Sequence, residues 1–172
     1  MPGSIENTLR ELNSWFDELP GGVRPKLLSK LATLELCCWI ETYIDVLIEK
    51  VGILCGFDDT WIKDNITNSN YGFSYNNHLR PMLIKLIGEM GVKSVETNIE
   101  KSKPGMLDQL KSELGSLWKA RGHLAHSPIV APLPQQTTIN APSWSLNRQR
   151  IIEKNLDILE KELEALIKTI AP

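Results

Sequence analysis

Apolar side chains recur every three or four residues along most of this chain, which is the period of one face of an α-helix. The first such stretch follows Ser4, a favoured N-cap residue, and ends at Pro20-Gly21-Gly22. A longer helix is predicted from Lys26 to Leu54, with Pro25 at its start and apolar residues on nearly all sides. Such a helix is usually central in a bundle.

Further helices are expected after the long central one. The pattern predicts a short helix over Asp59–Ile66 and then a helix over His78–Met90, which Asn76 or Asn77 caps and Gly91 ends. A helical turn is predicted within residues 92–102. Two longer helices follow, one from Pro104 to Ala125 or His126 and the last over Leu146–Ile170. Residues 68–77 are expected to form a loop whose alternating aromatics, Tyr71, Phe73 and Tyr75, dock on the bundle or on a ligand.

Residues 127–147 contain four prolines and are predicted to be a long loop. The loop either covers the residues before it or serves as a passive connector. No internal repeat or linker divides the chain into two cores. The predicted fold is therefore an all-α, up-and-down bundle of four or five main helices, forming a single domain over residues 1–172.

The composition of the chain limits which classes of function are compatible with it. Hydrophobic residues make up 42% of the chain and charged residues 23%, as in an ordinary soluble globular protein. The formal charge is −2, so any contact with nucleic acid must be local. Cys37, Cys38 and Cys55 lack metal-ligand spacing and are expected to be buried, reduced thiols. With neither a signal peptide nor a membrane span in the pattern, we expect a cytoplasmic protein.

One position on the apolar face of the helix after Pro104 is occupied by a charged residue. Its apolar face passes through Leu110, Leu114 and Leu117, and Arg121 falls where the next leucine is expected. A guanidinium out of water needs a partner, either an acidic side chain of another helix or an anionic ligand. The candidate partner is Glu41, near the apolar centre of the long helix.

Glu41, Asp45 and Glu49 are spaced four residues apart and share one helix face. For Asp45 and Glu49 the favoured interpretation is a solvated stripe. At the other end of the candidate site, Pro128 disfavours helix at Ser127 and leaves His126 at a helix C-terminus, where the dipole favours the imidazolium form.

An arginine and a histidine together suit cleavage of RNA. A histidine takes the proton of a ribose 2′-OH so that this oxygen attacks the neighbouring phosphate, and an arginine stabilises the phosphate charge without metal or cofactor. On an ideal helix Arg121 and His126 lie about 140° apart, and the last turn of the helix can unwind to bring them together. Geometry alone neither proves nor excludes this. Spacing alone does not distinguish this pair from an ordinary Arg and His near a helix end.

The run Arg121-Gly122-His123-Leu124-Ala125-His126 resembles the Arg-x4-His signature of HEPN domains (higher eukaryotes and prokaryotes nucleotide-binding). Further likeness lies in Trp39-Ile40-Glu41-Thr42-Tyr43 on the central helix and in Asn70-Tyr71-Gly72-Phe73-Ser74 before another helix. This combination is most similar to the RiboL-PSP type. In the family pattern the position after the arginine is often polar. Here it is Gly122, and His123 is either the replacement for that polar group or a helix-surface residue.

The resemblance implies a homodimer in which the motifs of both subunits line a shared cleft, giving a metal-independent endoribonuclease. It assigns Arg121 and His126 as the catalytic pair, with Glu41 as a supporting residue. It also suggests an effector of a defence or toxin–antitoxin system, with an antitoxin or other partner protein. The alternative is a non-catalytic HEPN-like module for dimerisation or for binding nucleotide or RNA.

Residues that contact RNA are expected beside the motif. Lys119 lies on the motif helix, and Lys111, Arg148, Arg150 and Lys154 are candidates for a basic rim. Tyr71 and Tyr75 are candidates to stack on unpaired bases. For Trp144, packing in the core is the favoured role.

Overall fold

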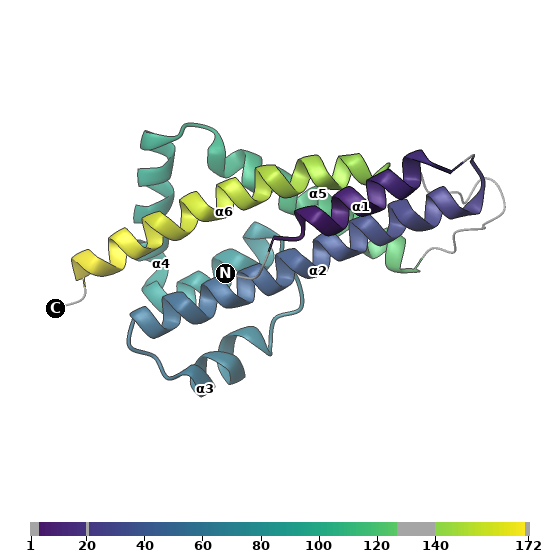
Figure 1. The fold of residues 1–172 in the computed structure, drawn as a ribbon. Helices are drawn as coiled ribbons and strands as arrows, with labels where there is room; N and C mark the ends of the chain where they lie inside the picture. Colours follow the sequence, from purple (N-terminus) through teal and green to yellow (C-terminus); the bar gives the residue numbers. More distant parts are fainter. Residues whose placement is uncertain (1–3, 20, 127–139, 171–172) are drawn as a thin grey trace.

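The structure, a computed structural model, describes residues 4–19, 21–126 and 140–170. These residues are almost entirely helical and include no β-strand, which confirms the predicted fold class. Four helices run along the bundle in alternating directions: α1 (Glu6–Asp17), α2 (Val23–Leu54), α5 (Met106–His126) and α6 (Pro142–Ile170) (Figure 1). Between α2 and α5 the chain forms α3 (Asp59–Ile62), the π-helical turns η1 (Lys63–Thr67) and η2 (Tyr75–Leu79), and α4 (Arg80–Ser102).

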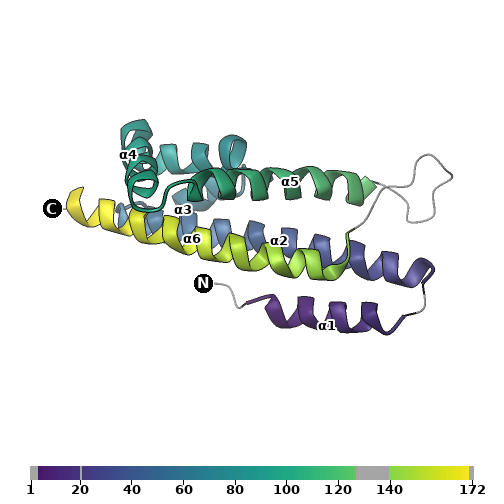
Figure 2. The same ribbon diagram turned by 90° about the horizontal axis from the view of Figure 1, so that it is seen from above.

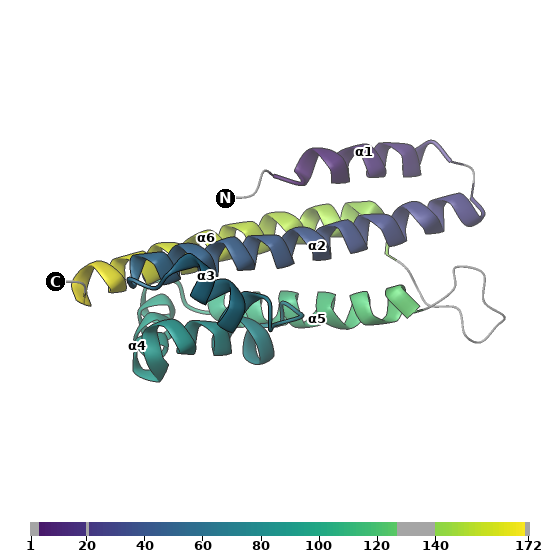
Figure 3. The same ribbon diagram turned by 90° about the horizontal axis from the view of Figure 1, so that it is seen from below.

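The helices form three layers. Helices α2 and α6 lie in the middle, α1 covers one side of this pair, and α5 covers the other together with α3 and α4 (Figures 2 and 3). The middle position of α2 follows from its sequence, because a helix that is apolar nearly all round must be covered on several sides. No helix of the described ranges is long and apolar enough to cross a bilayer.

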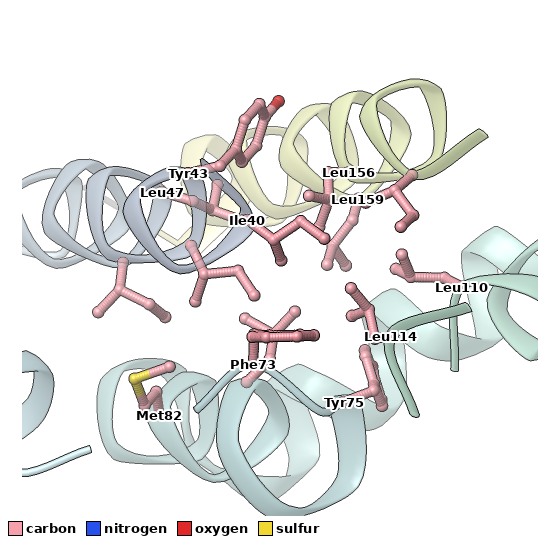
Figure 4. Packing of buried hydrophobic residues seen from close by; sticks show 14 of the residues in the cluster. Ile40, Tyr43, Leu47, Phe73, Tyr75, Met82, Leu110, Leu114, Leu156 and Leu159 are labelled. Carbon is pink, nitrogen blue, oxygen red and sulfur yellow. The ribbon is translucent and has the colours of Figure 1, made fainter. Parts of the chain in front are cut away.

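The core runs the length of the bundle between these layers. Ile40 and Leu47 of α2, Leu110 and Leu114 of α5, and Leu156 of α6 meet at its centre (Figure 4). All five are fully buried. Each fully buried side chain of this size contributes about 1.5–3 kcal/mol of apolar burial, so this packing sets how α5 is held against α2.

Polar side chains fix the register of the helices around the core. The Tyr43 hydroxyl donates to Asp157 Oδ1 at 2.6 Å and ties α2 to α6. Asn155 Nδ2 of α6 donates to Gln109 Oε1 of α5 at 3.1 Å. These bonds leave few ways to slide one helix along another, because a shift of one turn separates each pair.

Helix boundaries differ from the expectation at two prolines. Helix α2 begins at Val23, so Pro25 lies in its first turn rather than just before it, and α6 begins at Pro142 rather than Leu146. A proline is tolerated in a first turn because the N–H that it lacks has no helical partner there. The predicted Pro-rich loop therefore ends before Pro142, and its residues 127–139 lie outside the described ranges.

Helix α4 corrects the expected stop at Gly91. Gly91 continues the helix, and the break falls at Gly88, whose φ of 73° and ψ of 165° suit only glycine. Because the chain turns at Gly88, Met90 leaves the predicted apolar face and is 77% exposed. The α4 residues after the break, including Val95 and Ile99, then pack into the core.

The segment before α4 also differs from the expectation. Residues Tyr75–Leu79 form a π-helical turn rather than loop, and Ser74 with extended backbone precedes it, so neither Asn76 nor Asn77 is the cap. The short predicted helix over 59–66 is confirmed as α3 and η1, in which Ile62 is buried and Trp61 is 40% exposed. Of the cysteines, Cys37 is buried as predicted, but Cys38 is exposed and Cys55 is partly so.

The break in α4 generates a stability prediction. Gly88→Ala is expected to lower the free energy of unfolding by about 1–3 kcal/mol, because alanine does not favour this backbone conformation although no atom blocks its Cβ. Gly115→Ala in α5 is the matched control. Its Cβ also meets open space but its backbone is helical, so it is expected to add about 0.5–1 kcal/mol. Urea unfolding of both variants measures the difference, and equal effects would contradict it.

Candidate functional site

Arg121 meets the acidic residue predicted for it. Its Nη2 lies 3.4 Å from Oε1 and 3.5 Å from Oε2 of Glu41, which comes from α2. The arginine side chain is 37% exposed and the glutamate 26%. An ion pair this long and this hydrated contributes about 0–1 kcal/mol to stability. Its main effect is therefore to hold the guanidinium at the junction of α5 and α2.

The C-terminal turns of α5 form a shallow groove, here called the α5 groove. It is lined by Trp118, Lys119, Arg121, Gly122, His123 and His126 and encloses about 520 Å³. The structure thus brings the predicted Arg and both predicted His to one surface. It does so without unwinding the last turn, because α5 stays helical through His126. His123 and His126 are exposed, and a Cβ on Gly122 would meet no atom within 4 Å.

Trp118 forms the inner wall of the α5 groove and is held by aromatic contacts. Phe73 meets it edge-on with ring centroids 5.5 Å apart, and the His78 ring lies 4.8 Å away. The Arg121 guanidinium carbon lies 5.4 Å from the Trp118 ring centroid, one helical turn further along α5. Tryptophan faces attract guanidinium groups, so Trp118 restrains Arg121 from one side and Glu41 from the other.

A second depression adjoins the first and is here called the α2 cleft. It is lined by Glu41, Asp45, Thr67, Asn68, Asn70, Tyr71, Gly72 and Arg121 and encloses about 400 Å³. Arg121 belongs to both depressions. The α2 cleft and the α5 groove therefore form one continuous surface with the guanidinium at its centre.

Asp45 is the carboxylate of the α2 cleft that lacks a hydrogen-bonding or ionic partner among the described residues. It is partly buried, and among the described residues it has neither a hydrogen bond nor an ion pair. Burial, followed by the charges of Glu49 and Glu41, raises the pKa of Asp45 from 3.8 to about 6. The carboxylate is therefore ionised at neutral pH at a cost that no group among the described residues offsets.

The rim of the α2 cleft is a fixed turn. Asn70 Nδ2 donates to the Gly72 carbonyl at 3.3 Å, and the Ser74 N–H donates to His78 Nδ1 at 3.1 Å. A Cβ on Gly72 would lie 2.5 Å from His78 Nε2, so only glycine lets the turn pack this closely. The turn presents Tyr71 outward, with 84% of the residue exposed.

The predicted RNA-contacting residues divide into two groups. Lys119 and Tyr71 are exposed at the α5 groove and the α2 cleft. Tyr75 is 1% exposed and donates through its hydroxyl to Glu96 Oε1 at 3.0 Å, so it is a core residue and not a stacking platform. That assignment is wrong because Tyr75 starts a helical turn, which points it inward (Figure 4).

The expected basic rim is not assembled beside the motif. Arg148 pairs with Glu113 and stacks 4.2 Å from the Trp144 ring centroid, and Arg150 pairs with Glu6 at 2.8 Å. Trp144 packs against the core, as its sequence position suggested. Of the basic residues considered in the sequence, Lys119 and Arg121 are the ones that line the α5 groove.

The sequence pattern assigns a lesser role to two residues of this surface. It favours a solvated stripe for Asp45, although the position of Asp45 one turn after Glu41 indicates that it faces the same cleft. For His78 the pattern predicts only the start of a helix. The contact of its ring with Trp118 depends on the turn at Gly72, and a glycine in the sequence does not by itself predict that turn.

The arrangement combines a fixed cation with two titratable groups at a helix end. A guanidinium recognises phosphate oxygens, and imidazoles transfer protons near neutral pH. No family model, curated protein or solved structure matches this chain. The residues of the α5 groove and the α2 cleft are therefore what indicates a function for this chain.

The unpaired carboxylate generates a pH-dependent prediction. Because the folded pKa of Asp45 is raised, its contribution destabilises the fold above about pH 6 and disappears as the pH falls toward 3.8. Asp45→Asn is therefore expected to raise the free energy of unfolding at pH 7.5 by about 1 kcal/mol or less after solvent screening. This gain should shrink between pH 6 and pH 4.

Urea unfolding at several pH values measures this effect. Asp64→Asn removes an exposed carboxylate of η1 and serves as the control, with no gain expected. A destabilised Asp45→Asn protein at pH 7.5 would show that Asp45 has a stabilising partner after all.

Proposed function

We propose that this protein is a metal-independent endoribonuclease of the HEPN type. The observation that carries the proposal is the composition of the α5 groove, where Arg121 shares one surface with His123 and His126. The sequence run from Arg121 to His126 matches the Arg-x4-His signature. Glu41 supports the site as a positioning residue, because it holds Arg121 from a second helix.

The proposed reaction is an internal transfer within RNA. A neutral histidine takes the 2′-OH proton, the 2′ oxygen bonds to phosphorus, and the bond from phosphorus to the 5′ oxygen breaks. An imidazolium donates a proton to the departing 5′ oxygen. The products are a 2′,3′-cyclic phosphate and a 5′-OH, with no change in oxidation state. Arg121 stabilises the charge on the non-bridging phosphate oxygens throughout.

The two proton transfers need two histidines in opposite states. His126 lies at the end of α5, and we assign it the donation of a proton to the leaving oxygen. We assign the base to the same histidine of a second subunit, across a shared cleft. Lys119 and Tyr71 would hold the RNA on either side of Arg121, through a phosphate and a base.

An exposed apolar stripe on α2 supports a second copy as the partner. Val23, Leu27, Leu31, Leu34 and Cys38 recur at three- and four-residue intervals and lead directly to Glu41 and Asp45 on the same face. Val23 and Leu27 are each 48% exposed and Leu31 is 43% exposed. A continuous apolar face beside a polar site is typical of a protein interface. A subunit packed here would bring its own α5 near the first.

The biological setting follows from family analogy. A cytoplasmic ribonuclease of this type would act as the effector of a defence or toxin–antitoxin system. A dedicated antitoxin or other partner protein would then restrain it by covering the α5 groove.

The first test of this proposal is cleavage of single-stranded RNA in excess EDTA. Arg121→Ala and His126→Ala are each expected to lower the cleavage rate by about 10²–10⁴-fold, because one removes charge stabilisation and the other proton transfer. Arg10→Ala is the matched control, since Arg10 is an exposed arginine that pairs with Glu6 within α1. Product formation on a denaturing gel gives the rates.

Cleavage that survives both substitutions would exclude this site as the catalytic centre. Absence of cleavage by the wild-type protein, with RNA retained in a binding assay, would favour a non-catalytic RNA-binding module of the same fold. Circular dichroism and thermal unfolding of each variant establish that lost activity is not lost folding.

The stripe on α2 generates a separate prediction. Leu31→Glu is expected to weaken self-association by about tenfold or more and to lower RNA cleavage in parallel, because it places a charge in the apolar interface. Ile53→Glu at the far end of α2 is the control, since Ile53 is 56% exposed but lies off the stripe. Sedimentation equilibrium measures the association. A monomeric wild-type protein with full activity would refute the shared cleft.

A further inference from the structure

The α2 cleft has a chemistry that the proposed cleavage reaction does not use. Arg121, Lys119 and the histidines are sufficient for the phosphate and the protons. The α2 cleft instead offers an unpaired carboxylate, two asparagine side chains and a tyrosine on its rim. Depressions of this size with a few polar groups are typical of small-ligand sites.

Two side chains of the α2 cleft, Asp45 and Asn70, have hydrogen-bond acceptor oxygens without a partner in the described part of the chain. The Glu41 carboxylate is already engaged by Arg121 at 3.4 Å, whereas Asp45 has no partner within the described part of the chain. Asn70 uses its Nδ2 for the Gly72 carbonyl, which leaves its Oδ1 as an acceptor. A ligand that pairs with both oxygens of Asp45 presents two adjacent hydrogen-bond donors.

Tyr71 adds a flat surface beside these acceptors. Its 84% exposure is unusual for a ring of this size, and the Gly72–His78 packing fixes the turn that carries it. Exposed aromatic rings stack on unpaired bases in many complexes with single-stranded RNA. A planar ligand with donors on one edge is the chemistry that both features share.

We infer that the α2 cleft is a base-recognition subsite that selects guanine in the RNA substrate. Guanine is the base that presents two adjacent donors, N1–H and the N2 amino group, which match the two oxygens of one carboxylate. Adenine and cytosine place a ring acceptor beside their amino group, and uracil flanks its N–H with two carbonyls. Each of these sets a lone pair against an Asp45 oxygen and is disfavoured.

The position of Arg121 links this subsite to the cleavage chemistry. Because Arg121 lines both depressions, a nucleotide whose base occupies the α2 cleft has a phosphate close to the α5 groove. Asp45 therefore acts as a specificity-determining residue, and Tyr71 stacks on the same base. The inference rests on the proposed function for its RNA substrate.

Binding and cleavage are tested separately. Short 2′-fluoro RNA strands lack the attacking hydroxyl, so their affinity is measured without cleavage, by calorimetry at pH 7.5 on the full chain. A strand with one guanine among uracils is expected to bind at least about tenfold more tightly than the same strand with adenine, cytosine or uracil at that position. Asp45→Asn should abolish this preference, and Tyr71→Ala should weaken binding of all four strands.

Glu49→Gln is the matched control, because Glu49 is the next acid of this α2 face and does not line the α2 cleft. It should leave the guanine preference unchanged. Equal binding of the four strands, binding of none, or a preference that persists in Asp45→Asn overturns the inference.

Cleavage of ordinary RNA, mapped by sequence, separates this inference from the proposed function. One outcome is cleavage that depends on Arg121 but shows no base preference, together with equal binding of the four strands. That outcome would retain the ribonuclease and reject the guanine site. The opposite outcome is guanine-selective binding that Asp45→Asn abolishes, with no cleavage by the wild-type protein. That outcome would retain the guanine site and reject the ribonuclease.

Discussion

A guanidinium on an otherwise apolar helix face is the constraint around which this site is organised. Arg121 follows three fully buried leucines, Leu110, Leu114 and Leu117, on the same face of α5. It avoids the cost of burial because the face opens at the end of the bundle, where Glu41 and Trp118 hold the charged group at partial exposure. The packing of α5 on α2 therefore determines where the cation lies, and both neighbouring depressions take their position from it.

The fold was largely predictable because helix period and burial agree along the chain. The apolar surroundings of α2 indicated its central place, and the leucine spacing of α5 identified Arg121 as the exception and Glu41 as its partner. The helical period of apolar residues does not predict the backbone conformation of single residues. The break at Gly88 rather than Gly91 and the π-helical turn at Tyr75 changed which side chains face outward, so Met90 and Tyr75 exchanged their expected environments.

The candidate site was only partly predictable for a related reason. The Arg and His residues of α5 are adjacent in sequence, so a local motif was enough to find them. Asp45 and the rim at Gly72 come from separate segments, and their position beside Arg121 depends on how η1 and the following turn fold back onto α2. On the proposed mechanism, this surface divides its work: the α5 groove acts on the phosphate, and the α2 cleft reads the base next to it.

The chemistry of the product ends tests the proposed reaction most directly. RNA incubated with the protein in EDTA should yield fragments that end in a 2′,3′-cyclic phosphate and begin with a 5′-OH, as identified by mass spectrometry. A strand of the same sequence with 2′-deoxyribose at every position should remain intact. Fragments with a 3′-OH and a 5′-phosphate, or equal cleavage of the deoxy strand, would contradict attack by the 2′-OH and with it the proposed mechanism.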